Sequence, residues 1–183
     1  MNLAVAAEFD ARVRRNEPMS KHTSWRVGGT ADVFFTPRDR ADLAAFLAQL
    51  PQDSPLLWVG LGSNLLVRDG GIRGVVICTY GAFMRLEHRT AHHVYCEAGV
   101  PCARVTRTCA SWGLGHAEFF AGIPGTMGGA LAMNAGAYGG ETWSYVRAVA
   151  PPSLMMKFAC FSETTAPPIR KPLRLAASIR RAA

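Results

Sequence analysis

Two glycine-rich segments contain backbone and side-chain groups that could bind a ligand. The first is segment 60–69 (GLGSNLLVRD), which follows a short apolar strand at Trp58-Val59. Glycines leaving a strand let successive backbone N–H groups point at one phosphate, and Ser63 and Asn64 add side-chain hydrogen bonds. This pattern indicates a pyrophosphate-binding loop. On the glycines alone, a tight turn is the commoner explanation, and the segment lacks the third glycine of a Rossmann fingerprint and the lysine of a Walker loop.

The second segment, 122–140 (GIPGTMGGALAMNAGAYGG), holds seven glycines in 19 residues. Such a run clears side chains from a surface, so that a flat ring or a diphosphate can lie against backbone amides. Close packing of a small-residue helix explains the same composition equally well. A third fragment, 22–29 (HTSWRVGG), is by itself only a polar loop that ends in a glycine turn.

Short strands alternate with helices around these segments. Segment 31–36 alternates in strand fashion, and segment 38–50 places Leu43, Phe46 and Leu47 at helical spacing. Proline opens a second predicted helix at 101–112, and Gly113 stops it. Further strands are predicted at 56–59, 74–79 and 93–97. The pattern is that of a protein with both helices and sheets.

Composition changes abruptly near Ala150. All 18 glycines precede it, whereas residues 151–183 hold five prolines, six basic residues and one acid. Of the net charge of +7, the last 33 residues therefore contribute +5 and the first 150 only +2. The body of the protein has no basic surplus that would track nucleic acid, so no nucleic-acid partner is expected. The segment 150–183 is expected to be poorly ordered, because proline pairs interrupt helices and strands.

Other features exclude further classes of protein. Five scattered cysteines without a C-x-x-C pair are expected to be reduced and structural, and His92, His93 and Cys96 lack the partners of a metal site, so no metal is expected. The charged start of the chain has no signal-peptide core, and no apolar run is long enough to span a membrane. A cytoplasmic protein without a membrane partner is expected. The sequence gives no signal for an oligomeric state.

The three fragments, in this order and spacing, resemble the FAD-binding region of the UDP-N-acetylenolpyruvoylglucosamine reductase family. The matching stretches are 22–29, 60–77 (GLGSNLLVRDGGIRGVVI) and 113–141 (GLGHAEFFAGIPGTMGGALAMNAGAYGGE). The resemblance covers about residues 18–149, after a lead-in at 1–17 and before the tail at 150–183. It implies an α+β fold built from α/β lobes: the two-lobed FAD-binding domain of the vanillyl-alcohol-oxidase (PCMH) type, with the second lobe incomplete and the third, substrate domain absent.

By this resemblance, loop 60–65 holds the pyrophosphate of FAD, the later segment lines the flavin, and Tyr138 is a candidate for a place near the substrate. The implied cofactor-binding residues are Thr23, Gly60, Gly62, Ser63, Asn64, Leu65, Gly122, Ile123, Pro124, Gly125, Thr126, Gly128, Gly129, Asn134, Gly136 and Ala137. A tyrosine flanked by glycines is as often a packed aromatic with a satisfied hydroxyl. His116 and Glu118 are expected to be polar lining rather than catalytic groups.

The family reaction passes hydride from NADPH to FAD and then to the enolpyruvyl group of UDP-N-acetylglucosamine enolpyruvate, giving UDP-N-acetylmuramate for peptidoglycan synthesis. The family's catalytic groups lie in a Tyr-Arg-x-Ser segment, a Gly-Ser-x-Phe-x-Asn-Pro segment and a late glutamate, none of which is found here. No catalytic residue can therefore be assigned, and impaired turnover is expected. A gene lesion such as a frameshift is one hypothesis for the compositional break near Ala150.

Two alternatives stay open beside a reductase with impaired turnover. One is an inactive FAD-binding fragment that is unstable on its own. The other is the flavin-binding module of a different oxidoreductase of the same fold, since fold alone does not fix function. Such oxidases often tether the flavin through histidine or cysteine near the pyrophosphate loop, and segment 60–69 contains neither.

Overall fold

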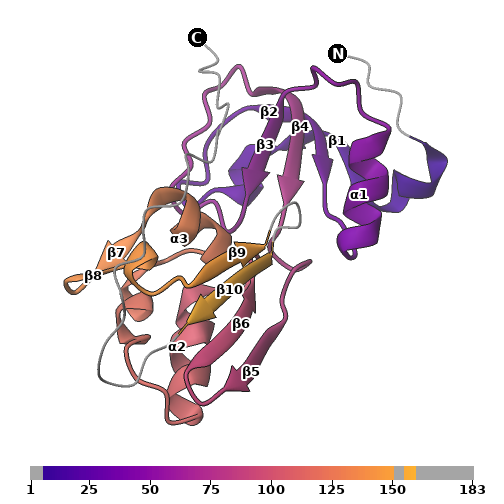
Figure 1. The fold of residues 1–183 in the computed structure, drawn as a ribbon. Coiled ribbons are helices and arrows are strands. Elements are labelled where there is room, and N and C mark those ends of the chain that lie inside the picture. Colours follow the sequence, from indigo (N-terminus) through magenta and orange to yellow (C-terminus); the bar gives the residue numbers. More distant parts are fainter. Residues whose placement is uncertain (1–5, 151–154, 160–183) are drawn as a thin grey trace.

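The computed structural model describes residues 6–150 and 155–159, which form two lobes, one above the other in Figure 1. The first lobe runs from the start of the described chain to about residue 83, and the second contains the rest. Each lobe combines one four-stranded sheet with helices. The predicted α+β fold class is confirmed.

The first lobe is a mixed sheet with strand order β1-β2-β4-β3. Strand β1 pairs antiparallel with β2, whereas β2 and β3 both run parallel to β4. Its elements are η1 (Ala7–Arg12), β1 (Val13–Pro18), η2 (Met19–His22), β2 (Thr30–Phe35), α1 (Arg40–Ala48), β3 (Leu56–Val59) and β4 (Ile72–Cys78). The predicted helix at 38–50 and the predicted strands at 31–36, 56–59 and 74–79 are therefore confirmed.

The central strands of this sheet are buried on both faces. On one face, Phe35 of β2 stacks on Phe46 of α1 with ring centroids 3.8 Å apart, and Phe9 packs edge-on against both rings. On the other face, Phe34 belongs to a second cluster with Met19 and Val76. The expectation of alternating burial in 31–36 is wrong, because residues Ala31–Phe35 are all buried. A strand covered on both sides carries apolar residues continuously rather than alternately.

The second lobe packs helices on one side of an antiparallel sheet with strand order β5-β6-β10-β9. Its elements are β5 (Leu86–Thr90), β6 (His93–Glu97), α2 (Cys102–Ser111), η3 (Glu118–Gly122), α3 (Met127–Met133), β7 (Gly136–Ala137), β8 (Gly140–Glu141), η4 (Thr142–Ser144), β9 (Ala148–Ala150) and β10 (Met155–Ala159). The predicted helix at 101–112 is confirmed as α2, with Pro101 as its N-cap and Gly113 just beyond its C-cap.

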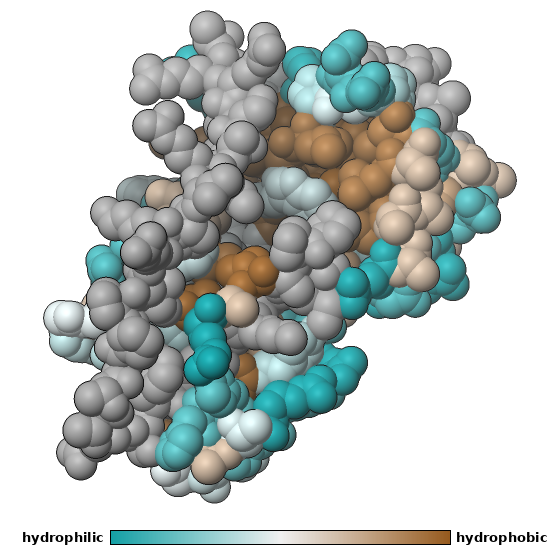
Figure 2. Space-filling model, in the orientation of Figure 1, coloured by the Kyte–Doolittle hydropathy of each residue, from teal (hydrophilic) through white to brown (hydrophobic). Residues whose placement is uncertain are grey.

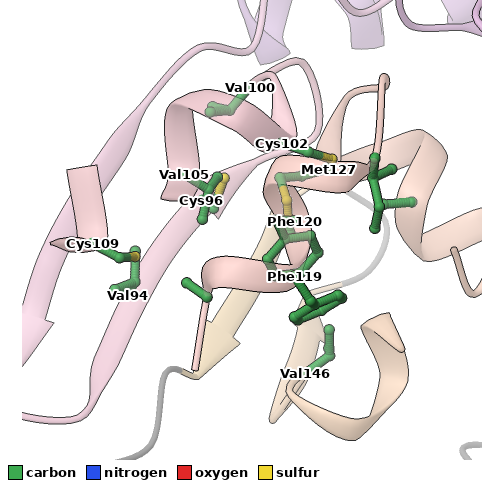
Figure 3. Packing of buried hydrophobic residues seen from close by; sticks show 13 residues of the cluster. Val94, Cys96, Val100, Cys102, Val105, Cys109, Phe119, Phe120, Met127 and Val146 are labelled. Atoms are coloured by element: carbon green, nitrogen blue, oxygen red, sulfur yellow. The ribbon is translucent and has the colours of Figure 1, made fainter. Parts of the chain in front are cut away.

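Helix α2, η3 and α3 bury one continuous core against β6. Figure 3 shows Cys96 of β6 close to Val105 of α2, and Met127 of α3 beside Phe120 of η3. Cysteines contribute as small apolar residues: Cys78, Cys96, Cys102 and Cys109 are buried and free, as predicted. Cys160 lies outside the described residues.

Strand β10 comes from the segment that the sequence predicts to be poorly ordered. Its backbone pairs with β6 over Met155–Ala159 and with β9 over Met155–Lys157. It thus lies between β6 and β9, and it is the element through which β9 joins the sheet. The other residues beyond Ala150 lie outside the described ones.

Large hydrophobic side chains remain exposed on the first lobe. Figure 2 shows hydrophobic residues gathered over this lobe beside α1, in the upper right of the view. On the edge strand β3, Leu56 and Trp58 are each more than 40% exposed. In the described residues, no helix is long and apolar enough to cross a membrane.

Candidate functional site

The two glycine-rich segments meet where the two lobes join. The loop at 60–65 leaves the carboxyl end of β3, and segment 122–129 links η3 to α3. A Cβ atom on Gly60 would lie 2.3 Å from Oγ1 of Thr126, so the glycine lets the Thr126 side chain pack directly on the backbone of residue 60. The Cβ position of Gly125 lies 3.5 Å from Oγ of Ser63. Segments about 60 residues apart in sequence therefore form one site.

The third fragment, 22–29, closes this loop from the other side. Gly62 has φ +65°, and a Cβ there would lie 1.9 Å from the carbonyl oxygen of His22. The Ser24 N–H donates to the carbonyl of Gly62 at 3.2 Å. Thr23 is buried between these contacts, and its hydroxyl donates to the carbonyl of Val27 at 3.3 Å. The three fragments that the sequence singles out are thus in contact.

Several backbone amides of this site have no acceptor among the described residues. They are the N–H groups of Gly62, Ser63 and Asn64, around the turn at 63–64, together with the N–H of Thr126. Thr126 is only 1% exposed, so its unpaired N–H is a buried donor. Buried donors are almost always paired, and successive free N–H groups in a turn form a concave anion-binding surface. These amides suit a bound diphosphate.

The remaining predicted residues of the second segment serve packing and turns. Gly128 donates its N–H to the carbonyl of Ala98, just beyond β6, at 2.8 Å, and Ile123 belongs to the core. Thr126 caps α3 by accepting from the N–H of Gly129 at 3.4 Å. Pro124 is exposed beside these groups. The other N–H groups of residues 123–129 all have acceptors, so the N–H of Thr126 is the backbone donor that the described part of this segment leaves to a ligand.

Residues 134–137 form a turn after α3. Asn134 is left-handed at φ +46° and ends the helix, donating to Glu141 at 3.0 Å and accepting from the N–H of Trp143 at 3.0 Å. Gly136 and Ala137 pair with β8. These contacts place Ala137 against Gly122, whose Cβ position lies 2.7 Å from the Ala137 methyl. They bring the turn to the edge of the site rather than into the amide cluster.

Tyr138 stands at the mouth of a pocket of about 490 Å³ on this edge. It is 85% exposed with φ +52°, and its ring lies over Gly122. Phe119 and Tyr145 stack at 4.9 Å on the opposite wall. The pocket is lined by His116, Glu118, Phe119, Tyr138, Gly139, Gly140 and Tyr145. His116 and Glu118 are therefore wall residues of an aromatic pocket beside the glycine segment.

Two titratable groups near the loop have shifted pKa values. Burial raises the pKa of the Cys78 thiol, whose Sγ lies 4.0 Å from the carbonyl oxygen of Gly60. Burial would also raise the pKa of Glu17, but a hydrogen bond from His22 and the charges of Arg14 and Lys21 outweigh it and lower that pKa. The sequence singles out His22 only as part of fragment 22–29 and does not predict its contact with Glu17, which is made across the short η2 turn. Within the described ranges, no cluster of three histidine, cysteine or acidic residues could hold a metal.

A family model described as an FAD binding domain matches residues 31–150. The chain belongs to this FAD binding domain family. The match contains both glycine-rich segments and every free amide described above, so the cofactor that the family name states agrees with the chemistry of the site.

Sequence relatives confirm the resemblance to the reductase family. UDP-N-acetylenolpyruvoylglucosamine reductase from Alkalilimnicola ehrlichii is 60% identical over 139 residues, which are 75% of this chain and 46% of that protein. The enzyme of the same name from Methylococcus capsulatus is 60% identical over 134 residues, 73% of this chain and 44% of that protein. The chain spans about half the length of the curated relatives it matches.

A solved structure agrees in fold. UDP-N-acetylenolpyruvylglucosamine reductase from Thermus caldophilus matches with a TM-score of 0.65 and 26% identity, covering 82% of this chain and 62% of that one. The two-lobed FAD-binding domain predicted from the resemblance is thus confirmed.

Proposed function

We propose that this chain is the FAD-binding part of a UDP-N-acetylenolpyruvoylglucosamine reductase. One observation carries the proposal: the free amides of the 60–65 loop and of Thr126 converge where both glycine-rich segments meet, inside the stretch matched by the FAD binding domain family. The names of relatives at about half coverage supply the substrate class. The reaction would contribute to peptidoglycan synthesis, and hence to cell shape and division, in the cytoplasm. The domain proposed for it is residues 18–149.

The residues present fit FAD in three places. The N–H groups of Gly62, Ser63 and Asn64 would bind the pyrophosphate oxygens, with the side chains of Ser63 and Asn64 as further donors. The N–H of Thr126 would bind from the other lobe, which gives an acceptor to a buried donor that has none among the described residues. Segment 122–125 with Ala137 would line the flavin, because Gly122 and Gly125 present no side chain of their own there, and the Ala137 methyl and the Tyr138 ring pack against Gly122.

A bound flavin supplies hydride transfer, while the protein supplies binding, orientation and electrostatics. In the proposed reaction NADPH is the reductant and UDP-N-acetylglucosamine enolpyruvate the acceptor. The aromatic pocket at Tyr138 opens beside the proposed flavin segment, and Tyr138 is the residue of this chain that we place near the substrate. Because the downstream family segments are not found in these 183 residues, we propose that the chain alone binds FAD but turns over poorly.

The test is an absorption spectrum of the purified chain with added FAD, followed by anaerobic NADPH. A structured flavin band near about 450 nm that stays with the protein on gel filtration is expected. Bleaching of the bound flavin by NADPH would show that the first half-reaction is supported. Bound flavin without bleaching would restrict the proposal to cofactor binding, and a chain that folds but retains no flavin would refute it.

A further inference from the structure

The buried carboxylate of Glu17 is the most heavily paired acid near the site. Its Oε1 lies 2.9 Å from Nε2 of His22, 3.1 Å from Nη1 of Arg14 and 3.9 Å from Nζ of Lys21. The side chains of Arg14 and Lys21 are 53% and 64% exposed, whereas that of His22 is 18% exposed. Ion pairs with exposed partners contribute little, so the bond to His22 is the one that fixes geometry.

The imidazole of His22 is held by two different strands. Nε2 must donate to Glu17 on β1, because an ionised carboxylate is only an acceptor. The ring also stacks on the buried Phe34 of β2, with centroids 4.0 Å apart and planes at 25°. A histidine fixed in both position and orientation fixes its own backbone as well.

The backbone at His22 packs directly against Gly62 of the 60–65 loop. Its carbonyl oxygen occupies the space that a side chain on Gly62 would need, and the next amide but one, that of Ser24, donates to the Gly62 carbonyl. A few residues further on, the Gly29 N–H donates to the carbonyl of Arg68 at 3.1 Å. Glu17, His22 and Gly62 therefore form one continuous line of contacts from the sheet to the free amides.

We propose that Glu17 and His22 are a positioning pair for the pyrophosphate-binding loop. By holding the His22 carbonyl against Gly62, the pair aims the N–H groups of Gly62, Ser63 and Asn64 at one point. Preorganised donors bind an anion without first having to be ordered, so loosening the pair lowers affinity even when the lobe stays folded. This inference rests on the proposed function, since it takes the FAD diphosphate as the anion.

Three substitutions in the full chain separate the hydrogen bond from simple packing. Glu17→Gln removes the charge but keeps an amide oxygen that can accept from His22, His22→Phe keeps a ring on Phe34 but has no donor, and His22→Gln restores an N–H donor without the ring. Glu87→Gln is the matched control: Glu87 is also an ion-paired glutamate, contacting Arg85 and Arg89, but it lies on β5 in the other lobe.

The first measurement needs no cofactor. Hydrogen exchange of the peptide that contains Ser24 and Gly29 reports the bonds into the loop, and a peptide from α2 serves as reference. We expect exchange of the Ser24 and Gly29 amides to be about tenfold faster in His22→Phe, the size of effect that one net hydrogen bond gives, and faster by a smaller factor in Glu17→Gln. The α2 amides should not change.

The second measurement is FAD affinity by quenching of flavin fluorescence. We expect the Kd to rise about tenfold in His22→Phe and by a smaller factor in Glu17→Gln, with His22→Gln closer to the wild type, by the same net hydrogen-bond estimate. His22→Phe binding as well as the wild type would overturn the proposal, because ring packing would then be sufficient. An equal loss in Glu87→Gln would overturn it too.

The two proposals can fail separately. If the wild-type chain binds FAD and all variants match it in affinity and exchange, the positioning pair is refuted and the proposed function stands. If the folded wild-type chain binds no FAD, the proposed function fails, and the role of the pair in cofactor binding fails with it.

Discussion

The contact between Gly60 and Thr126 gives a sharp quantitative prediction. Replacing Gly60 by alanine puts a methyl group 2.3 Å from Oγ1, 3.0 Å from Cγ2 and 3.2 Å from Cβ of Thr126. The φ of Gly60 lies outside the left-handed region, so alanine meets no backbone strain and the cost is steric alone. The two closest atoms, Oγ1 and Cγ2, are absent from alanine, so Thr126→Ala removes most of the clash and leaves only the 3.2 Å contact with Cβ.

The magnitude follows from how little Thr126 can move. It is 1% exposed, and its hydroxyl caps α3. Forcing a methyl into a packed site costs about 1–3 kcal/mol of unfolding free energy. Removing the cap in Thr126→Ala costs about 0.5–2 kcal/mol, and the long 3.4 Å bond places this case at the lower end.

The double variant Gly60→Ala/Thr126→Ala decides whether this account is right. The new methyl would occupy the space that the threonine side chain vacates, so the pair should cost little more than Thr126→Ala alone. We expect a favourable coupling of about 1–2 kcal/mol, measured as the departure from additivity in urea unfolding followed by circular dichroism. Costs that add within about 0.5 kcal/mol would refute the claim that the lobes touch at these two residues.

Three further outcomes are expected. Gly62→Ala should abolish FAD binding, because its Cβ would meet the His22 carbonyl at 1.9 Å with φ at +65°, whereas Gly70→Ala, with open space around it, should bind like the wild type in the same fluorescence titration. The pKa of Glu17 is lower in the folded protein than its ordinary value of 4.5 in the unfolded chain. The stability that Glu17 adds over Glu17→Gln, measured by urea unfolding, should therefore be fully present above pH 4.5 and disappear as the pH falls through the lower, folded pKa. A difference in stability that does not depend on pH would contradict this. Burial raises the pKa of Cys102 to about 12 and that of Cys96 further, so in a Cys160→Ser variant these thiols should react with a disulfide reagent at pH 8 only on unfolding, after the less buried Cys78.

The local pattern of apolar residues was sufficient to predict several helices and strands. The helix α1 and the strands β2, β3, β4 and β6 have apolar periodicity or continuous apolar runs, and the sequence predicts all of them. Strands β1 (VRRNEP) and β5 (LEHRT) were missed, because they are polar edge strands whose conformation depends on pairing with β2 and β6. A strand that is stabilised mainly by pairing with its neighbour need not show any apolar periodicity in its sequence.

The candidate site, too, has parts that local sequence marks and parts that depend on the folded structure. Glycine content marked segments 60–69 and 122–140, but glycine alone could not tell a turn from a ligand loop. The contact of Gly60 with Thr126 joins positions 66 apart in sequence, so it comes from the topology of the fold and leaves no local pattern. The bond of Glu17 to His22 joins positions five apart, but it depends on the irregular turn of η2, which has no sequence period to detect.

The position of β10 bears on where this domain can be cut. The family match ends at residue 150, yet in the sheet β10 fills the place between β6 and β9. An expression product that stops at residue 150 would release the backbone N–H and C=O groups of β6 from Met155–Ala159 and leave β9 with no neighbour. An open strand edge is a template for intermolecular pairing. During synthesis, likewise, the second lobe cannot close its sheet until residue 159 has left the ribosome, so the minimal folding unit is longer than the stretch that defines the family.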